Sequence, residues 1–269
     1  MPISPLNILL GEILGTMILV GGGNGVITKI LFMNKKREDP GRLTGFKGFS
    51  GSLVLAVLAS AKLSGGHLNP AVTIGLWTAG LCSVGHVPFY IIGQLIGAFL
   101  GQMIIYFFFF HQENQENQET KNMKLLQTLE NTKRDQFLGN DFDKQKENQL
   151  DILQCFCTTS SHFNEMHDLA HEIFGTAILL FMIQVGGARL PIFVFSLYLA
   201  FILYSIFHLV GRFAYNPTRD LVPRLVHHYF LIKDKGDSDW KYAWIPIAGP
   251  IIGGVLGCLL ATICIIEFV

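Results

Sequence analysis

Six long apolar stretches constrain the fold of this chain more than any other feature of its sequence. They lie near residues 8–32, 46–66, 87–110, 170–188, 190–211 and 243–268. A helix of about 20 apolar residues spans a hydrocarbon core of roughly 30 Å, in which every backbone polar group must be paired within the protein. Only 15% of the 269 residues are charged, whereas soluble domains carry about 25%. The sequence therefore predicts an all-α membrane protein with six transmembrane helices, and its zero formal net charge suggests no nucleic-acid partner.

Two short Asn-Pro elements stand beside these spans, "HLNPAVT" at 67–73 and "FAYNPTRD" at 213–220. About ten residues of helix follow each Asn-Pro pair, which is about 15 Å and half of a membrane. Asn is a good helix cap, and Pro suits the first helical turn because its missing N–H is not needed there. One such element is most often a plain turn. Two in equivalent settings predict two re-entrant half-helices that meet end to end at the midplane.

Half-helices of this kind would line an aqueous lumen, because irregular polar backbone at membrane depth is tolerated where it lines a water-filled cavity. Their N-termini carry positive potential, which opposes cations and protons. The side-chain amides of Asn69 and Asn216 would donate to passing hydroxyl groups. Arg219 would add a permanent charge at a second constriction, and Asp220 would stabilise the second half-helix. These residues predict a channel.

The chain also carries the marks of an internal duplication. "GEILGT" at 11–16 returns as "HEIFGT" at 171–176, and "GQLIGAFLG" at 93–101 returns as "GPIIGGVLG" at 249–257. The Asn-Pro elements lie between them in the same order. Each half holds three spans, an odd number, so the halves insert in opposite orientations.

We therefore expect one channel domain over 1–269, with repeats over about 6–110 and 165–268. Glycines recur every four residues in "GQLIGAFLG" and "GPIIGGVLG", and these glycine ladders are expected to pack the two halves together. They are Gly93, Gly97 and Gly101, and Gly249, Gly253 and Gly257. Glu12 and Glu172 are expected to hold loop backbone, not to transfer protons. The polar stretch over about 111–150 is predicted to be a solvated tether, with a helix near 123–138 as the alternative.

"SGGHLNPAVT" at 64–73 and "FAYNPTRD" followed by "LVPR" at 213–224 resemble the two signatures of the major intrinsic protein family, the aquaporins and aquaglyceroporins. The second signature has the form of the glycerol-facilitator branch, which Asp220, Arg224, Pro246 and Ile247 match. The resemblance implies a homotetrameric six-helix channel in the plasma membrane, which passes water, glycerol and similar small polyols without a cofactor, a metal or enzymatic activity. It assigns the pore motifs to Asn69, Pro70 and Ala71 with His67 in support, and to Asn216, Pro217 and Thr218, where Thr replaces Ala.

The same resemblance, counted back from each Asn, places the selectivity filter on Phe49, Tyr204, Phe213 and Arg219. Aromatic walls would suit the carbon edge of a polyol, while Arg219 would bind its hydroxyls. The glycerol branch usually has Gly where this chain has Tyr204. A Tyr there would narrow the filter, which gives a water-selective channel as the alternative function. A one-residue slip would place Ser205 there and leave the filter wide.

Other interpretations of the sequence remain open. His167 and His171 are four residues apart, like two metal ligands on a helix face, which would suit an intramembrane metalloenzyme. A non-conducting adhesion protein is a further alternative. The family topology places both termini in the cytoplasm, whereas the basic 33–45 loop argues for the opposite orientation.

Overall fold

The structure is a computed structural model that describes residues 3–33, 40–111, 138–160, 164–187, 190–211 and 214–268. Within these ranges the regular secondary structure is entirely helical. The helices are α1 (Pro5–Met33), α2 (Pro40–Ser64), α3 (Pro70–Thr78), α4 (Val87–Ile105), the π-helical η1 (Tyr106–His111), α6 (Leu138–Gln154), α7 (Glu165–Gly187), α8 (Ile192–Leu209), α9 (Pro217–Tyr229) and α10 (Ile245–Phe268).

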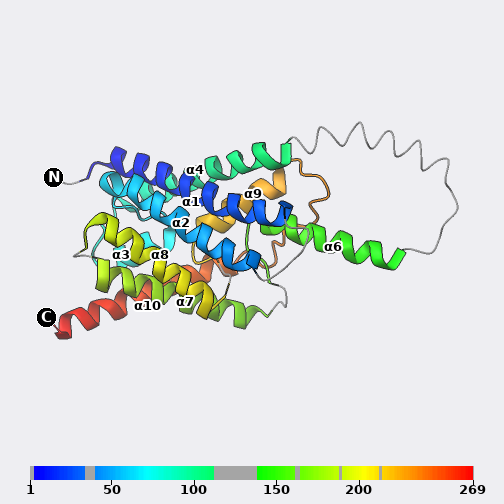
Figure 1. The fold of residues 1–269 in the computed structure, drawn as a ribbon. Coiled ribbons are helices and arrows are strands. Elements are labelled where there is room, and N and C mark those ends of the chain that lie inside the picture. Colours follow the sequence, from blue (N-terminus) through cyan, green and yellow to red (C-terminus); the bar gives the residue numbers. More distant parts are fainter. Residues whose placement is uncertain are drawn as a thin grey trace.

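All six predicted spans are present as long apolar helices. By length and composition, the segments able to cross a membrane are Pro5–Leu31, Thr44–Ser64, Val87–His111, Glu165–Gly186, Ile192–Leu209 and Ile245–Ile265. Both termini lie at one end of the bundle, and α6 extends from the other end (Figure 1). An even number of spans requires this placement of the termini.

The helices pack in two equivalent sets, as the inverted repeat predicts. In the first half α1 packs on α2 and α4, and in the second half α7 packs on α8 and α10. The half-helices α3 and α9 cross over, because α3 packs on α10 and α9 packs on α4. The main apolar core joins α1 and α2 to α7 and α8, around the tips of the two half-helices. Each half therefore completes the other around the centre of the molecule.

The glycine ladders pack within each half, so the expectation that they join the two halves is wrong. A Cβ on Gly97 of α4 would lie 2.5 Å from the backbone oxygen of Ile13 in α1. A Cβ on Gly253 of α10 would lie 2.2 Å from the backbone oxygen of Ile173 in α7. Small residues let helix backbones approach this closely in lipid. The ladders face α1 and α7, the helices that carry Glu12 and Glu172. Both glutamates are fully buried, so the neighbouring helices must pack closely around them.

A different glycine pair lies at the contact between α3 and α10, which belong to different halves. Gly75 of α3 faces Gly254 of α10, and a Cβ on Gly75 would lie 2.7 Å from the backbone oxygen of Gly254. The half-helix of the first repeat is therefore seated directly against the last span of the second.

We expect Gly253→Ala to destabilise the protein strongly. The added carbon would meet backbone, which cannot rotate away, so α10 would have to move off α7. Overpacking of this kind costs about 1–3 kcal/mol or more. The matched control is Gly51→Ala in α2, where an added Cβ meets no atom within 4 Å and Ala is the better helix former by about 1 kcal/mol. Thermal unfolding of the purified proteins in detergent measures both, and equal midpoints for the two variants would contradict the packing argument.

The polar insertion is helical in its last part, which the tether interpretation did not anticipate. Residues 112–137, with most of the alternative helix near 123–138, lie outside the described residues, but α6 covers 138–154. The end of α6 and the loop after it contribute Leu153 and Phe156 to a second apolar cluster with Tyr106 and Val226. The apolar residues after 150 supply the burial that the Gln- and Asn-rich part lacks. The insertion is therefore anchored to the channel at its C-terminal end.

Candidate functional site

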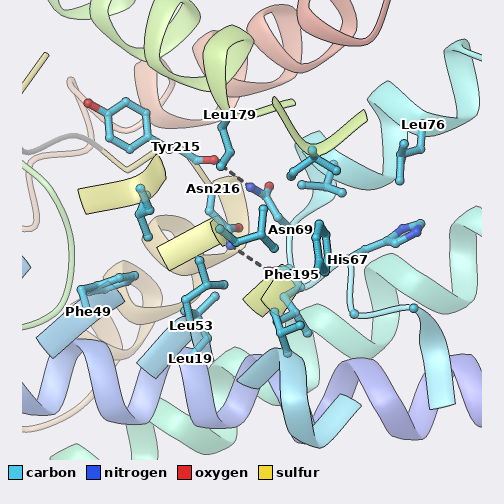
Figure 2. A pocket seen from close by; sticks show the side chains of 18 of the residues that line it. Leu19, Phe49, Leu53, His67, Asn69, Leu76, Leu179, Phe195, Tyr215 and Asn216 are labelled. Atoms are coloured by element: carbon cyan, nitrogen blue, oxygen red, sulfur yellow. Dashed lines mark hydrogen bonds between the residues drawn. The ribbon is translucent and has the colours of Figure 1, made fainter. Parts of the chain in front are cut away.

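A cavity of about 160 Å³ lies at the centre of the bundle, where the two half-helices meet (Figure 2). Asn69 and Asn216 both line it. Much of the remaining wall is apolar, and this part comprises Leu19, Phe49, Leu53, Val57, Val72, Leu76, Leu179, Ile183, Phe195, Leu199, Leu203 and Phe207. The cavity therefore has a few polar groups at its middle and a long apolar surface around them.

The two asparagines cap their half-helices and also join them to one another. Asn69 Oδ1 accepts from the backbone N–H of Ala71 at 2.9 Å, and Asn216 Oδ1 accepts from those of Thr218 at 3.1 Å and Arg219 at 3.3 Å. Asn69 Nδ2 donates to the backbone oxygen of Tyr215 at 2.7 Å, and Asn216 Nδ2 donates to that of Leu68 at 2.8 Å. Each amide nitrogen carries two hydrogens. A second N–H on each asparagine is therefore available to a molecule in the cavity.

The backbone oxygens that receive these bonds belong to residues in an unusual conformation. Leu68 has φ of 56° and Tyr215 has φ of 53°, which is the left-handed region where non-glycine residues are uncommon. Such a conformation costs about 1–3 kcal/mol and persists only where its surroundings enforce it. The conformation turns each carbonyl towards the asparagine of the opposite half.

Two buried glutamates enforce this conformation. Glu12 accepts from the backbone N–H groups of Leu68 at 2.6 Å and His67 at 3.0 Å. In the second half Glu172 accepts from those of Tyr215 and Ala214, both at 2.8 Å. Hydrogen bonds to a carboxylate are about twice as strong as neutral ones. Each acid therefore fixes the loop whose carbonyl oxygen binds the opposite asparagine.

The first loop has further support from side chains. Gln94 Nε2 donates to Glu12 at 2.8 Å, and the Ser64 hydroxyl donates to it at 2.6 Å. The imidazole of His67 stacks on Tyr90 with ring centroids 3.9 Å apart, and its Nδ1 lies 3.1 Å from Thr73 Oγ1. His67 is therefore held by its neighbours while it lines the cavity.

Two of the four expected filter residues come together, and of these Phe49 lines the cavity whereas Arg219 does not. The guanidinium of Arg219 lies 5.1 Å from the ring centroid of Phe49, which is within cation–π range. Arg219 is only 2% exposed, and among the described residues its Nη1 has no hydrogen-bond partner. Phe213 lies outside the described residues.

Tyr204 lies beside the face of α8 that lines the cavity and is not part of that face. Its ring contacts His208, with centroids 4.4 Å apart. Among the described residues, those of α8 that line the cavity are Phe195, Leu199, Leu203 and Phe207. The helix ends at Leu209, and Gly211 follows with φ of 114°, so a residue count from Asn216 does not fix the rotation of α8. Ser205 bonds to its own helix through its hydroxyl and the backbone oxygen of Phe201.

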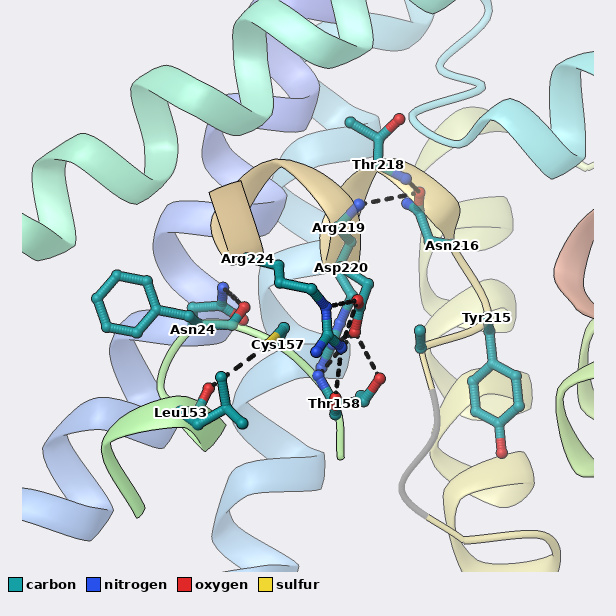
Figure 3. A network of polar contacts seen from close by, with 12 residues as sticks. Asn24, Leu153, Cys157, Thr158, Tyr215, Asn216, Thr218, Arg219, Asp220 and Arg224 are labelled. Atoms are coloured by element: carbon teal, nitrogen blue, oxygen red, sulfur yellow. Dashed lines mark hydrogen bonds and ion pairs between the residues drawn. The ribbon is translucent and has the colours of Figure 1, made fainter. Parts of the chain in front are cut away.

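Asp220 joins the second half-helix to the loop after α6 (Figure 3). Its Oδ2 accepts from the backbone N–H of Thr158 at 2.7 Å and from the Thr158 hydroxyl at 2.5 Å. Its Oδ1 accepts from Arg224 Nε at 3.0 Å and Nη2 at 2.8 Å. Arg224 is fully buried and also donates to the backbone oxygens of Thr158 at 2.7 Å, Ser238 at 2.7 Å and Asp239 at 3.0 Å. The pair therefore ties two segments to α9, the loop that holds Thr158 and the loop that holds Ser238 and Asp239.

The loop is fastened on its other side by a polar pair between α1 and α4. Asn24 Nδ2 donates to Gln102 Oε1 at 2.8 Å and to the backbone oxygen of Phe156 at 3.0 Å. Cys155 and Cys157 flank Phe156, and both side chains are buried. Near the C-terminal end of α9, the imidazole of His227 is buried, and its Nδ1 lies 2.9 Å from Ser238 Oγ.

Sequence reasoning missed this attachment of the loop. Thr158 stands in a polar stretch without a motif, and Asn24 and Gln102 lie inside apolar spans. Two isolated polar residues in spans are a signal for a buried pair, but the sequence alone does not say that they lie opposite each other.

The two histidines of the metalloenzyme alternative are neighbours, with ring centroids 4.0 Å apart. The parts of the chain that the structure describes contain no group of three His, Cys, Asp or Glu side chains arranged to hold a metal ion. Glu172, the acid that follows His171, already accepts from the backbone N–H groups of Ala214 and Tyr215. The arrangement at the centre of the bundle is therefore the better candidate for the functional site.

The model of the "Major intrinsic protein" family matches residues 3–261. The chain belongs to the major intrinsic protein family. Family members similar to it include the "Probable glycerol uptake facilitator protein" of Thermotoga maritima, 34% identical over 95% of this chain and 98% of the relative. The "Glycerol uptake facilitator protein" of Streptococcus pneumoniae strain R6 is also 34% identical, over the same shares of the two chains.

A solved structure of the family supports the same fold. The X-ray structure of the aquaglyceroporin from Plasmodium falciparum matches with a TM-score of 0.72 and 25% identity, and the match covers 98% of each chain. Family membership and the six apolar helices make this chain a multi-pass integral membrane protein. The prediction of an aquaporin-like fold, with six spans and two half-helices, is therefore confirmed.

Proposed function

We propose that this protein is a passive membrane channel for water and small uncharged solutes such as glycerol, and that it excludes protons and ions. The observation that carries the proposal is the pair Asn69 and Asn216, which line one central cavity from opposite half-helices. The relatives named as glycerol uptake facilitators support glycerol as a solute. A protein with this function is not an enzyme and needs no cofactor.

The geometry suits an uncharged, hydroxyl-bearing solute. The remaining N–H of each asparagine can donate to a hydroxyl oxygen, while the apolar wall contacts the carbon side of the molecule. Two helix N-termini converge on the same point, each equivalent to about half a positive charge. Their combined field raises the energy of any cation at the centre of the pore.

For the filter we propose three of the four residues that the family resemblance assigns. Phe49 and Arg219 form an apolar and a cationic wall in contact with each other. Phe213 is proposed to join them. Tyr204 packs beside His208 and does not line the cavity, so its place in the filter is decided by the Tyr204 variant described below.

The water-selective alternative depends on a filter narrowed by Tyr204. It has less support, because Tyr204 lies off the cavity-lining face of α8 described above and the similar relatives are named for glycerol. The assembly is proposed to be a homotetramer in the plasma membrane, with both termini in the cytoplasm.

Proteoliposomes test the function directly. We expect the reconstituted protein to accelerate swelling in a glycerol gradient and shrinkage in an impermeant osmolyte, while a pH-sensitive dye inside the vesicles shows no faster proton entry than in empty vesicles. Water flux without glycerol flux would establish the water-selective alternative. Absence of both fluxes would overturn the proposal in favour of a non-conducting role.

A further inference from the structure

The cavity face of α8 is set by a regular spacing. Phe195, Leu199, Leu203 and Phe207 recur every four residues and all line the cavity. Because each residue turns an α-helix by about 100°, Tyr204 lies about 100° from Leu203 and about 60° from Phe207 around the helix axis. Its ring meets His208 and is not among the described side chains that line the cavity. Phe207 is therefore the last ring that α8 presents to the cavity before the helix ends.

The ring of Phe207 is fixed on several sides. It is 5% exposed and stacks on Phe46, with centroids 4.9 Å apart and an interplanar angle of 13°. It meets Phe49 edge to face at 6.1 Å and 83°, and it lies 5.8 Å from the ring of Tyr215. A ring with so many neighbours cannot swing aside to admit a wider solute.

Phe207 also lies beside the proposed filter. Its partner Phe49 is the ring over which the guanidinium of Arg219 lies. The two phenyl rings meet nearly at a right angle, so they form an apolar corner next to the cation. A linear polyol can place its carbon edge in such a corner, whereas a wider solute meets two immobile walls.

We propose that Phe207, rather than Tyr204, is the residue of α8 that sets the upper size of the solutes this channel passes. The proposal rests on the channel function proposed above. Phe207 acts through its volume and rigidity, since its ring carries no hydrogen-bonding group. Shortening it removes one wall of the corner and leaves the asparagines, Arg219 and Phe49 in place.

The experiment compares three variants in proteoliposomes, Phe207→Ala, Phe207→Leu and Tyr204→Ala, with water, glycerol and the five-carbon polyol xylitol. We expect Phe207→Ala to raise the ratio of xylitol to glycerol permeability by about tenfold, and Phe207→Leu to raise it less, since changes of one or a few carbons in an apolar site alter selection by factors of this size. Tyr204→Ala should leave the ratio within about twofold of the original protein.

The ratio separates selection from folding, because a variant that merely misfolds loses all fluxes together. If Phe207→Ala does not fold, Phe207→Leu keeps most of the ring's packing and decides the question by the direction of its ratio. An increase in Tyr204→Ala without one in either Phe207 variant would overturn the proposal. The proposed function is judged separately by glycerol flux through the unaltered protein: a water-only channel that gains glycerol flux in Phe207→Ala would refute that function and still support the role of Phe207.

Discussion

Arg224→Met should destabilise this protein by about 3–5 kcal/mol, the usual cost of leaving one partner of a buried ion pair without the other. The guanidinium is fully buried and makes five hydrogen bonds, to the Asp220 carboxylate and to three backbone oxygens. Met fills a similar volume but donates no hydrogen bond. The variant would leave the Asp220 carboxylate with Thr158 as its remaining hydrogen-bond donor and with Arg219, whose Nη1 lies 3.9 Å from Asp220 Oδ2, as its remaining cation. Thermal unfolding in detergent measures the loss.

The double variant Asp220→Leu/Arg224→Met is the informative comparison. Because it removes both members of the Asp220–Arg224 pair together, it should recover part of the stability that the single variant loses, while the buried Arg219 loses its contact with Asp220. Lys241→Met, at an exposed position, is the surface control and should change stability by less than about 0.5 kcal/mol. A single variant as stable as the Lys241 control would show that the ion pair does not support the loop.

Asn216→Asp should abolish most glycerol conduction and admit cations. The carboxylate can still accept from the backbone N–H groups of Thr218 and Arg219, so the helix cap and the fold should survive. The substitution removes both amide N–H groups of Asn216, the one that donates to the Leu68 oxygen and the one proposed to donate to solute. The helix N-terminus favours the ionised form of the new acid. An unpaired acceptor costs about 1–3 kcal/mol, so glycerol permeability should fall by about tenfold or more. The negative charge also offsets the positive field that excludes cations.

Glycerol-driven swelling and a potassium flux assay on the same vesicles measure the two effects. By symmetry Asn69→Asp should behave alike, since Asn69 makes the equivalent cap and cross-contact. Asn7→Asp carries the same chemical change at an exposed position and should leave both fluxes unaltered. Glycerol flux at the original level together with potassium exclusion in Asn216→Asp would contradict the proposed role of the central amides.

The spans and half-helices were predictable because each depends on local rules. Twenty apolar residues must be helical in lipid, and Asn69-Pro70 and Asn216-Pro217 combine a cap with a first-turn proline. The contact between the half-helices followed from their length and from the duplication. The expected filter residues Phe49 and Arg219 followed from the family motifs, and the structure brings them together.

The remaining features depend on three-dimensional choices that sequence patterns do not carry. Leu68 and Tyr215 adopt left-handed conformations that neither side chain favours, so only the contact with a distant glutamate accounts for them. The rotation of α8, which separates Phe207 from Tyr204, is set by packing against Phe46 and Phe49. A glycine ladder predicts close packing against some helix but does not say which one. In this structure the ladders pack on α1 and α7, the helices that carry the two buried glutamates.

The reciprocal bonds between Asn69 and Tyr215 and between Asn216 and Leu68 have a consequence for how such a gene can change. The carboxylate encoded in one copy of the duplicated segment sets the shape of a loop that the other copy needs for its own amide. A substitution at Glu12 is therefore felt at Asn216, and one at Glu172 is felt at Asn69. The two copies are free to diverge in their lipid-facing residues. At the pore, however, a change in the glutamate of one copy has to remain compatible with the asparagine of the other.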